Sequence, residues 1–313
     1  MDLEGLDLDD VGLDDMGPMV ETILGGATLD RLKRAQVPAG TGGAGLVGTL
    51  FARAYQAGHA DEYLHLLTYI AQFAPRFDQH ADLDNAANGV PLAWGTAAPK
   101  LICLPSLVLQ SGAHQFVRFA ASLDGIRDVV VLPHPGFLPG QPIAADVDAI
   151  GHLQARAIRR IAGDDPFVIV GYSSGGWVGH VAASLLEAAG IRPDAVVLLD
   201  TYPPCDKRVA EMRPEILRRM AVLQEQGSTA GEAWLFATAV HMGLFDGWQP
   251  RPVQAPTLLL KASEPPPGAM PAGEWQAHWP VPHAAVEVLG NHFTVMEEHA
   301  ANTATAIHRW LAS

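Results

Sequence analysis

The chain has 313 residues, of which 49% are hydrophobic and 17% are charged, so it can bury a sizeable core in one large domain or two modest ones. No charge-free apolar run of 18 residues occurs, and Cys103 and Cys205 are the only cysteines, which argues against a transmembrane helix, a disulfide framework and a zinc ribbon. The acidic N-terminus does not look like a secretory signal. We therefore expect a cytoplasmic protein without a metal site.

The negative charge is concentrated at the start of the chain. Residues 1–30 carry nine Asp or Glu and no Lys or Arg, so −9 of the net charge of −14 lies there. Such blocks are typically solvated and unstructured, and we expect residues 1–42 to be an acidic linker. No basic stripe that could neutralise phosphates is present, so neither a nucleic acid nor a membrane is expected as a partner.

Residues 43–78 predict two amphipathic helices. Gly58 ends the first, Asp61 can cap the second, and Pro75 ends it. The apolar face of the second helix is broader than a single surface contact requires. The two helices therefore either pack on the domain that follows or form a dimer contact through residues 45–75.

From residue 79 onward the pattern indicates an α/β domain. Short strands that are apolar throughout alternate with helices, which is typical of a mostly parallel sheet covered on both faces. The predicted strands are 101–104, 129–132, 167–170, 195–199, 257–260 and 285–289. The predicted helices are 114–124, 146–162, 175–189 and 297–311.

A helix-rich insertion, about 206–250, interrupts this alternation and suits a lid over an active site. It carries Trp234, Phe236, Met242 and Phe245. These side chains either line an apolar chamber or belong to the core.

The motif Gly171-Tyr-Ser173-Ser-Gly175 directly follows a predicted strand and precedes a predicted helix. A nucleophile elbow has this context, because a sharp strand-to-helix turn lifts the serine hydroxyl above the sheet. Glycines two residues away on either side leave room for the neighbouring backbone. The motif predicts Ser173 as an acyl-accepting nucleophile, with the backbone N–H of Ser174 in the oxyanion hole.

A serine nucleophile needs a base, and in this fold the chain order is serine, acid, histidine. His292 lies on the loop between the last predicted strand and the final helix, whereas His278, His283 and His299 are rivals only by nearness in sequence. The loop position favours His292 as the base.

Two acids compete to orient the histidine. Asp200 ends one predicted strand and Glu264 follows the next, and both loops open on the same edge of the sheet. Spacing alone leaves both open.

Together these motifs resemble the C-terminal thioesterase domains of modular type I polyketide synthases, which have the α/β-hydrolase fold. The resemblance covers about 43–311. The matching stretches are Leu50-Phe51 through Phe77, Cys103-Leu-Pro-Ser106 with Ser111-Gly-Ala-His-Gln-Phe116, Gly171 to Gly176, Val197-Leu-Leu-Asp200-Thr-Tyr-Pro-Pro204 and Gly290-Asn-His-Phe-Thr294.

The resemblance implies that Asp200, rather than Glu264, completes the catalytic triad. It implies a homodimer through residues 45–75, a lid over a channel, and a polyketide thioester delivered on the phosphopantetheine arm of an acyl carrier protein, without a cofactor of the enzyme's own. The family's Gly before a small hydroxyl residue is replaced here by Pro105 before Ser106. Because proline lacks an N–H, the second oxyanion donor is Ser106 or Leu107.

The sequence thus predicts release of a polyketide through a seryl acyl-enzyme. It does not choose between hydrolysis and macrolactonisation. A stand-alone serine esterase or editing thioesterase, expected to lack the N-terminal helical pair, and a non-catalytic hydrolase-fold binding protein are the alternatives.

Overall fold

The computed structural model describes residues 46–81, 83, 88–108, 111–204, 206–225, 233–267 and 275–312. All of these belong to one compact unit. The expected linker, 1–42, lies outside the described residues, as does the segment 226–232 inside the insertion. No helix in the described segments is both long enough and apolar enough to cross a lipid bilayer.

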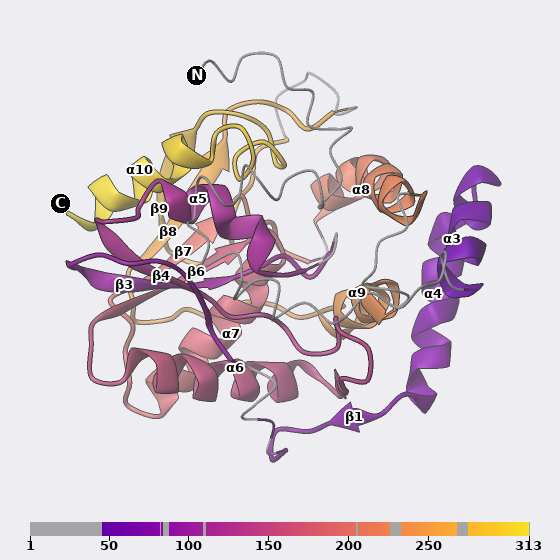
Figure 1. The fold of residues 1–313 in the computed structure, drawn as a ribbon, viewed down its shortest axis with the longest axis horizontal. Helices are drawn as coiled ribbons and strands as arrows, with labels where there is room; N and C mark the ends of the chain where they lie inside the picture. Colours follow the sequence, from indigo (N-terminus) through magenta and orange to yellow (C-terminus); the bar gives the residue numbers. More distant parts are fainter. Residues whose placement is uncertain are drawn as a thin grey trace. The chain divides into compact units, whose positions relative to one another are not determined.

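Among the described residues, seven strands form a sheet in the order β2-β4-β3-β6-β7-β8-β9 (Figure 1). They are β2 (Val90–Ala93), β3 (Ala97–Leu104), β4 (Arg127–Val131), β6 (Phe167–Tyr172), β7 (Ala195–Leu199), β8 (Thr257–Ala262) and β9 (Ala284–Val288). β2 pairs antiparallel with β4, and the other neighbours are parallel. The predicted, mostly parallel sheet is confirmed, with a short antiparallel edge strand that the sequence did not signal.

Helices cover both faces of this sheet. They are α5 (Val117–Ala121), α6 (Val147–Ala162), α7 (Gly175–Ala188) and α10 (Ala300–Leu311), with the 3-10 turn η3 (Ala113–Phe116) before α5. Figure 1 shows α6 and α7 on one face and α5 and α10 on the other, and α7 packs directly on β3, β6 and β7. The predicted α/β class is therefore confirmed, although the last helix begins at Ala300 rather than at residue 297.

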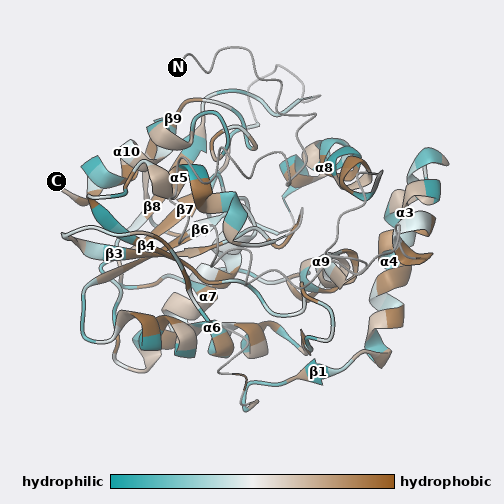
Figure 2. Cartoon of the chain, in the orientation of Figure 1, coloured by the Kyte–Doolittle hydropathy of each residue, from teal (hydrophilic) through white to brown (hydrophobic). Residues whose placement is uncertain are grey.

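The centre of the sheet is the core of the unit. Every residue of β6 and β7 is buried, and Figure 2 shows the hydrophobic colour along these strands. Burying one Val, Leu or Ile side chain contributes about 1.5–3 kcal/mol, so the central strands are a rigid base for the loops at their carboxyl ends.

The insertion and the N-terminal helices form a second layer of packing. The insertion supplies α8 (Lys207–Glu225) and α9 (Ala233–Leu244), and α3 (Leu46–Gln56) contacts α8 while α4 (Ala60–Ile70) contacts α9. A 3-10 turn, η2 (Ala71–Phe73), follows α4, and a two-stranded pair joins β1 (Arg76–Phe77) to β5 (Ile143–Ala144). One face of each N-terminal helix is thus packed on the insertion.

Asp61 does not cap α4. The N-cap residue is His59, which makes no side-chain capping bond, and Asp61 lies in the first turn. Its carboxylate instead forms an ion pair with Arg213 of α8. In the first turn of α4, the Asp61 carboxylate interacts favourably with the positive end of the helix dipole. Its ion pair also connects α4 to the insertion.

Two buried histidines should make the fold sensitive to acid. Burial lowers the pKa of His134 to about 3 and that of His241 to about 4, so both are neutral in the folded protein near neutral pH. Below about pH 6.5 the unfolded chain takes up protons at these positions while the folded protein does not, so each histidine removes about 1.4 kcal/mol of stability per pH unit until its folded pKa is reached. We expect urea midpoints to fall steeply from pH 6.5 to 4.

The matched variants are His241→Gln and His283→Gln, since His283 is exposed. As the pH falls, the unfolding free energy of His241→Gln should decline less steeply than that of wild type, by about 1.4 kcal/mol per pH unit. His283→Gln should decline as wild type does. Equal slopes for wild type and His241→Gln would contradict this account.

Candidate active site

Ser173 lies on the sharp turn between β6 and α7. Its φ is 52°, a left-handed conformation that is rare for a residue with a Cβ, and its N–H donates to Leu199 O at 2.9 Å. The turn is closely packed: a Cβ at Gly171 would come within 2.4 Å of Gly176 Cα, and one at Gly175 within 2.3 Å of Pro105 O. The glycines of the motif are therefore required by backbone contacts.

Three predicted residues meet above the carboxyl edge of the sheet. Ser173 Oγ lies 3.0 Å from His292 Nε2, and His292 Nδ1 lies 2.8 Å from Asp200 Oδ2. A carboxylate only accepts hydrogen bonds, so Nδ1 carries the proton and Nε2 is free to accept the serine proton. His292 and Asp200 are 4% and 1% exposed, so bulk water competes little for these bonds.

Asp200 follows β7 and is fixed by the neighbouring strand, β8. Its φ is 43°, its N–H donates to Leu260 O at 2.9 Å, and its Oδ1 accepts the N–H of Ala262 at 2.9 Å. Glu264, the competing acid, is exposed on the surface. The structure thus brings Asp200, and not Glu264, to the imidazole.

The His292 loop is held by neighbouring side chains. Asn291 Oδ1 accepts the N–H groups of Phe293 and Thr294, at 3.0 and 3.2 Å. Tyr172 Oη donates to His292 O at 2.9 Å, and its ring stacks on the imidazole with centroids 5.8 Å apart. Burial raises the pKa of Tyr172, so this hydroxyl stays protonated and keeps donating.

The rival histidines make other contacts. His278 Nδ1 lies 3.1 Å from Asp206 Oδ2, and the exposed His283 bonds to Val281 O at 2.8 Å. The His299 ring packs beside Gly290.

The loop after β3 is the candidate for the second oxyanion donor. Both predicted donors are already bonded: the Ser106 N–H donates to Gln115 Oε1 at 2.8 Å, and the Leu107 N–H donates to Ser174 Oγ at 2.9 Å. His134 lies 2.8 Å from Pro105 O and further fixes the loop. These bonds attach the loop rigidly to the elbow. They also mean that both N–H groups already have an acceptor, so either would have to exchange it to bind an oxyanion.

A small chamber of about 30 Å³ lies over the serine. It has room for about two water molecules. Its lining residues come from the elbow, from the loops beside it and from the insertion: Val108, Ser173, Ser174, Trp177, Tyr202, Val209, Met212, Ile216, Met242 and His292. Apart from Ser173, Ser174, His292, the Tyr202 hydroxyl and the Trp177 indole N–H, these side chains are apolar.

Of the four insertion residues that the sequence singled out, only Met242 lines the chamber. Trp234 and Phe245 are completely buried, and Phe236 is packed against the core, so these three belong to the core. The missed lining residues are on α8, at positions 209, 212 and 216. Their helical spacing of three and four was the available signal.

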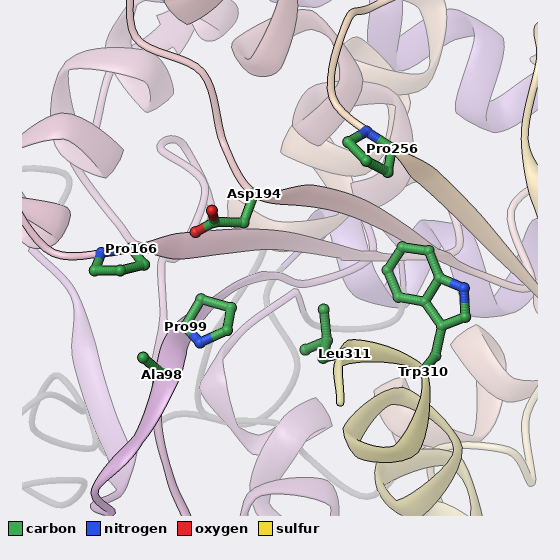
Figure 3. Close-up of a pocket in the computed structure, with 7 residues that line it drawn as sticks. All are labelled: Ala98, Pro99, Pro166, Asp194, Pro256, Trp310 and Leu311. Atoms are coloured by element: carbon green, nitrogen blue, oxygen red, sulfur yellow. The ribbon is translucent and has the colours of Figure 1, made fainter. Parts of the chain in front are cut away.

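A larger hollow, of about 460 Å³, lies at the opposite end of the strands (Figure 3). Pro166 and Pro256, which directly precede β6 and β8, line it together with Trp310. Its one ionisable lining side chain, Asp194, has no nucleophile or base beside it in the hollow. The chemistry-bearing residues therefore lie at the smaller chamber. Among the residues that the structure describes, no group of three His, Cys, Asp or Glu side chains is arranged to hold a metal ion.

The chain is similar to parts of known polyketide synthases. It is 40% identical over 272 residues to polyketide synthase GfsE of Streptomyces halstedii, covering 85% of this chain and 7% of that protein. It is also 40% identical over 298 residues to the spectinabilin polyketide synthase system protein NorC of Streptomyces orinoci, covering 93% of this chain and 13% of that protein. The chain therefore spans only a small part of these relatives.

The fold is similar to that of the Vlm2 thioesterase domain bound with a dodecadepsipeptide, with a TM-score of 0.54 and 18% identity over 72% of this chain and 97% of that one. The sequence model described as Thioesterase domain matches residues 99–311, which hold the elbow, the acid and the histidine. The chain belongs to the thioesterase domain family.

Proposed function

We propose that this thioesterase releases a finished polyketide from an acyl carrier protein in the cytoplasm, through an acyl-enzyme on Ser173. The observation that carries the proposal is the hydrogen-bonded line Ser173–His292–Asp200 beneath an apolar chamber. Similarity to parts of two polyketide synthases supports the substrate class.

In the first step, His292 Nε2 accepts the Ser173 proton as the hydroxyl oxygen attacks the thioester carbonyl. Asp200 holds the imidazole in the tautomer that can accept it and stabilises the imidazolium that forms. The imidazolium then protonates the departing thiol. A thiol has a pKa of about 8.5 and leaves more readily than an amine, so acylation makes modest demands on the imidazolium as a proton donor.

The tetrahedral oxyanion needs donors, each typically contributing about 3 kcal/mol. Ser174 is the N-cap of α7, where backbone N–H groups lack a carbonyl one turn back, and we assign its N–H as the first donor. We assign the Ser106 N–H as the second. It must exchange Gln115 Oε1 for the oxyanion, because that oxygen holds it in the free enzyme.

In the second step, His292 activates either water, which gives a free acid, or a hydroxyl of the bound chain, which gives a macrolactone. The acyl group would arrive on a phosphopantetheine arm of the carrier protein, so the enzyme needs no cofactor of its own for either route.

The test is to offer the purified chain a hydroxyacyl N-acetylcysteamine thioester and identify the products by mass. We expect a burst of free thiol equal to the enzyme, followed by turnover to the hydroxy acid or to a product 18 mass units lighter, the lactone. Labelling of Ser173 by a fluorophosphonate without turnover of any acyl thioester would favour an esterase of another substrate class. If the fluorophosphonate did not label Ser173 at all, the result would favour a non-catalytic binding protein.

We also propose that residues 45–75 form a homodimer contact, because α4 and the turn η2 that follows it expose large apolar side chains. Leu66, Tyr69 and Phe73 are 51%, 59% and 83% exposed. Leu66→Glu with Phe73→Glu should convert a dimer into a monomer, since burying an unpaired carboxylate is costly.

Sedimentation velocity measures this, with Leu289→Glu as the matched control. Leu289 is an equally exposed leucine (54%) at the end of β9. A wild type that sediments as a monomer would contradict the dimer.

A further inference from the structure

We propose that Arg219 is a positioning residue that couples the roof helix of the chamber, α8, to the loop that carries His292. The proposal rests on the function assigned above. It adds a residue outside the triad that sets how well the base is aligned.

The roof of the chamber is part of α8. Val209, Met212 and Ile216 lie along one face of this helix and line the chamber. Arg219 follows Ile216 by three residues, so it lies one turn further along nearly the same face.

Arg219 is held at both ends of its guanidinium. Nε lies 2.9 Å from Glu215 Oε1, one turn back on α8, and the side chain of Glu215 is only 10% exposed. Nη1 lies 3.1 Å from Glu297 Oε1, which follows the His292 loop. The central carbon of the guanidinium lies over the Phe293 ring, 4.1 Å from its centroid. Arg219 therefore joins the roof to the loop by an ion pair and a cation–π contact.

Phe293 passes this contact on to the base. Its ring is 3% exposed and stands edge-on to the His292 imidazole, with centroids 5.2 Å apart and an interplanar angle of 86°. A displaced Phe293 ring would leave the imidazole without one of its walls. Small errors in orienting a catalytic group cost rate steeply, so the Arg219 contact should be visible in kcat.

The test compares Arg219→Met, which keeps the length and apolar stem, with Arg219→Lys, which keeps the charge. Each is assayed with acetyl and long-chain N-acetylcysteamine thioesters, and for the rate at which a small fluorophosphonate labels Ser173. Arg218→Met is the matched control, because Arg218 is the neighbouring arginine and its guanidinium binds Glu215 on its own helix.

For Arg219→Met we expect kcat and the labelling rate to fall about tenfold with both substrates, with KM changed less than about twofold. Arg219→Lys should recover most of this loss, and Arg218→Met should resemble wild type. If Arg219→Met does not fold, Glu297→Gln removes the same ion pair from the other side and should lower the labelling rate in the same direction.

A purely structural role for Arg219 in the roof predicts a different pattern. It would change KM for the long thioester alone and leave labelling of Ser173 at the wild-type rate, and that result overturns the proposal. A wild type that is not labelled at all contradicts the proposed function instead, so the two failures are distinguishable.

Discussion

Replacing Ser173 with alanine is expected to lower acyl transfer by about 10⁴-fold or more, leaving only the catalysis that binding and the oxyanion hole provide. The variant lacks the oxygen that lies 3.0 Å from His292 Nε2, so no acyl-enzyme can form. Intact-protein mass spectrometry after mixing with an acyl thioester should show no added acyl mass.

The control for this result is Ser122→Ala. The Ser122 hydroxyl donates to Arg118 O and lies just after α5, and its loss should leave turnover unchanged. Acyl mass retained on Ser173→Ala would mean that another side chain is the nucleophile.

The second large effect is expected at Asp200. Asp200→Asn keeps the shape of the side chain but replaces the carboxylate beside His292 Nδ1 with an amide that can also donate, which favours the wrong imidazole tautomer. By analogy with other triads we expect a loss of about 10⁴-fold in kcat. Steady-state kinetics with the same thioester measures it.

Glu264→Gln is the paired variant, because Glu264 is the acid that sequence spacing left open beside Asp200. Its side chain is exposed, so we expect less than about a twofold change. If Glu264→Gln proved the more damaging of the two, the acid would have been misassigned.

The fold could be predicted from the sequence where the signal is local. The strands at the sheet centre are apolar throughout because both of their faces are covered, and this pattern was sufficient to predict a parallel sheet. The edge strand β2 was missed, because Val90–Ala93 contains a proline and is too short to show a period.

The candidate site could be predicted in part. The nucleophile and the base stand in motifs whose flanking strand and helix identify them, and both lie where the motifs imply. The choice between Asp200 and Glu264 depends on which loop reaches the imidazole, and spacing does not encode that distance. The chamber lining depends on how α8 docks, so the sequence left open whether the aromatic residues of the insertion line the chamber or belong to the core.

The oxyanion loop shows the same limit. The sequence restricted the second donor to Ser106 or Leu107 by excluding proline, but it could not foresee that Gln115 and the Ser174 hydroxyl would bond to these N–H groups. Partners of this kind depend on how the loop packs against η3 and the elbow, and only the packed structure reveals them.

Both Ser173 and Asp200 have positive φ angles, 52° and 43°. A backbone held this way in a residue with a Cβ costs of order 1 kcal/mol, and a glycine at either position would relieve it. A lineage no longer selected for acyl transfer could therefore lose the Ser173 hydroxyl without weakening its fold, whereas loss of the Asp200 carboxylate would leave the buried N–H of Ala262 without its acceptor. Inactive descendants of such a domain should arise readily and persist as well-folded proteins.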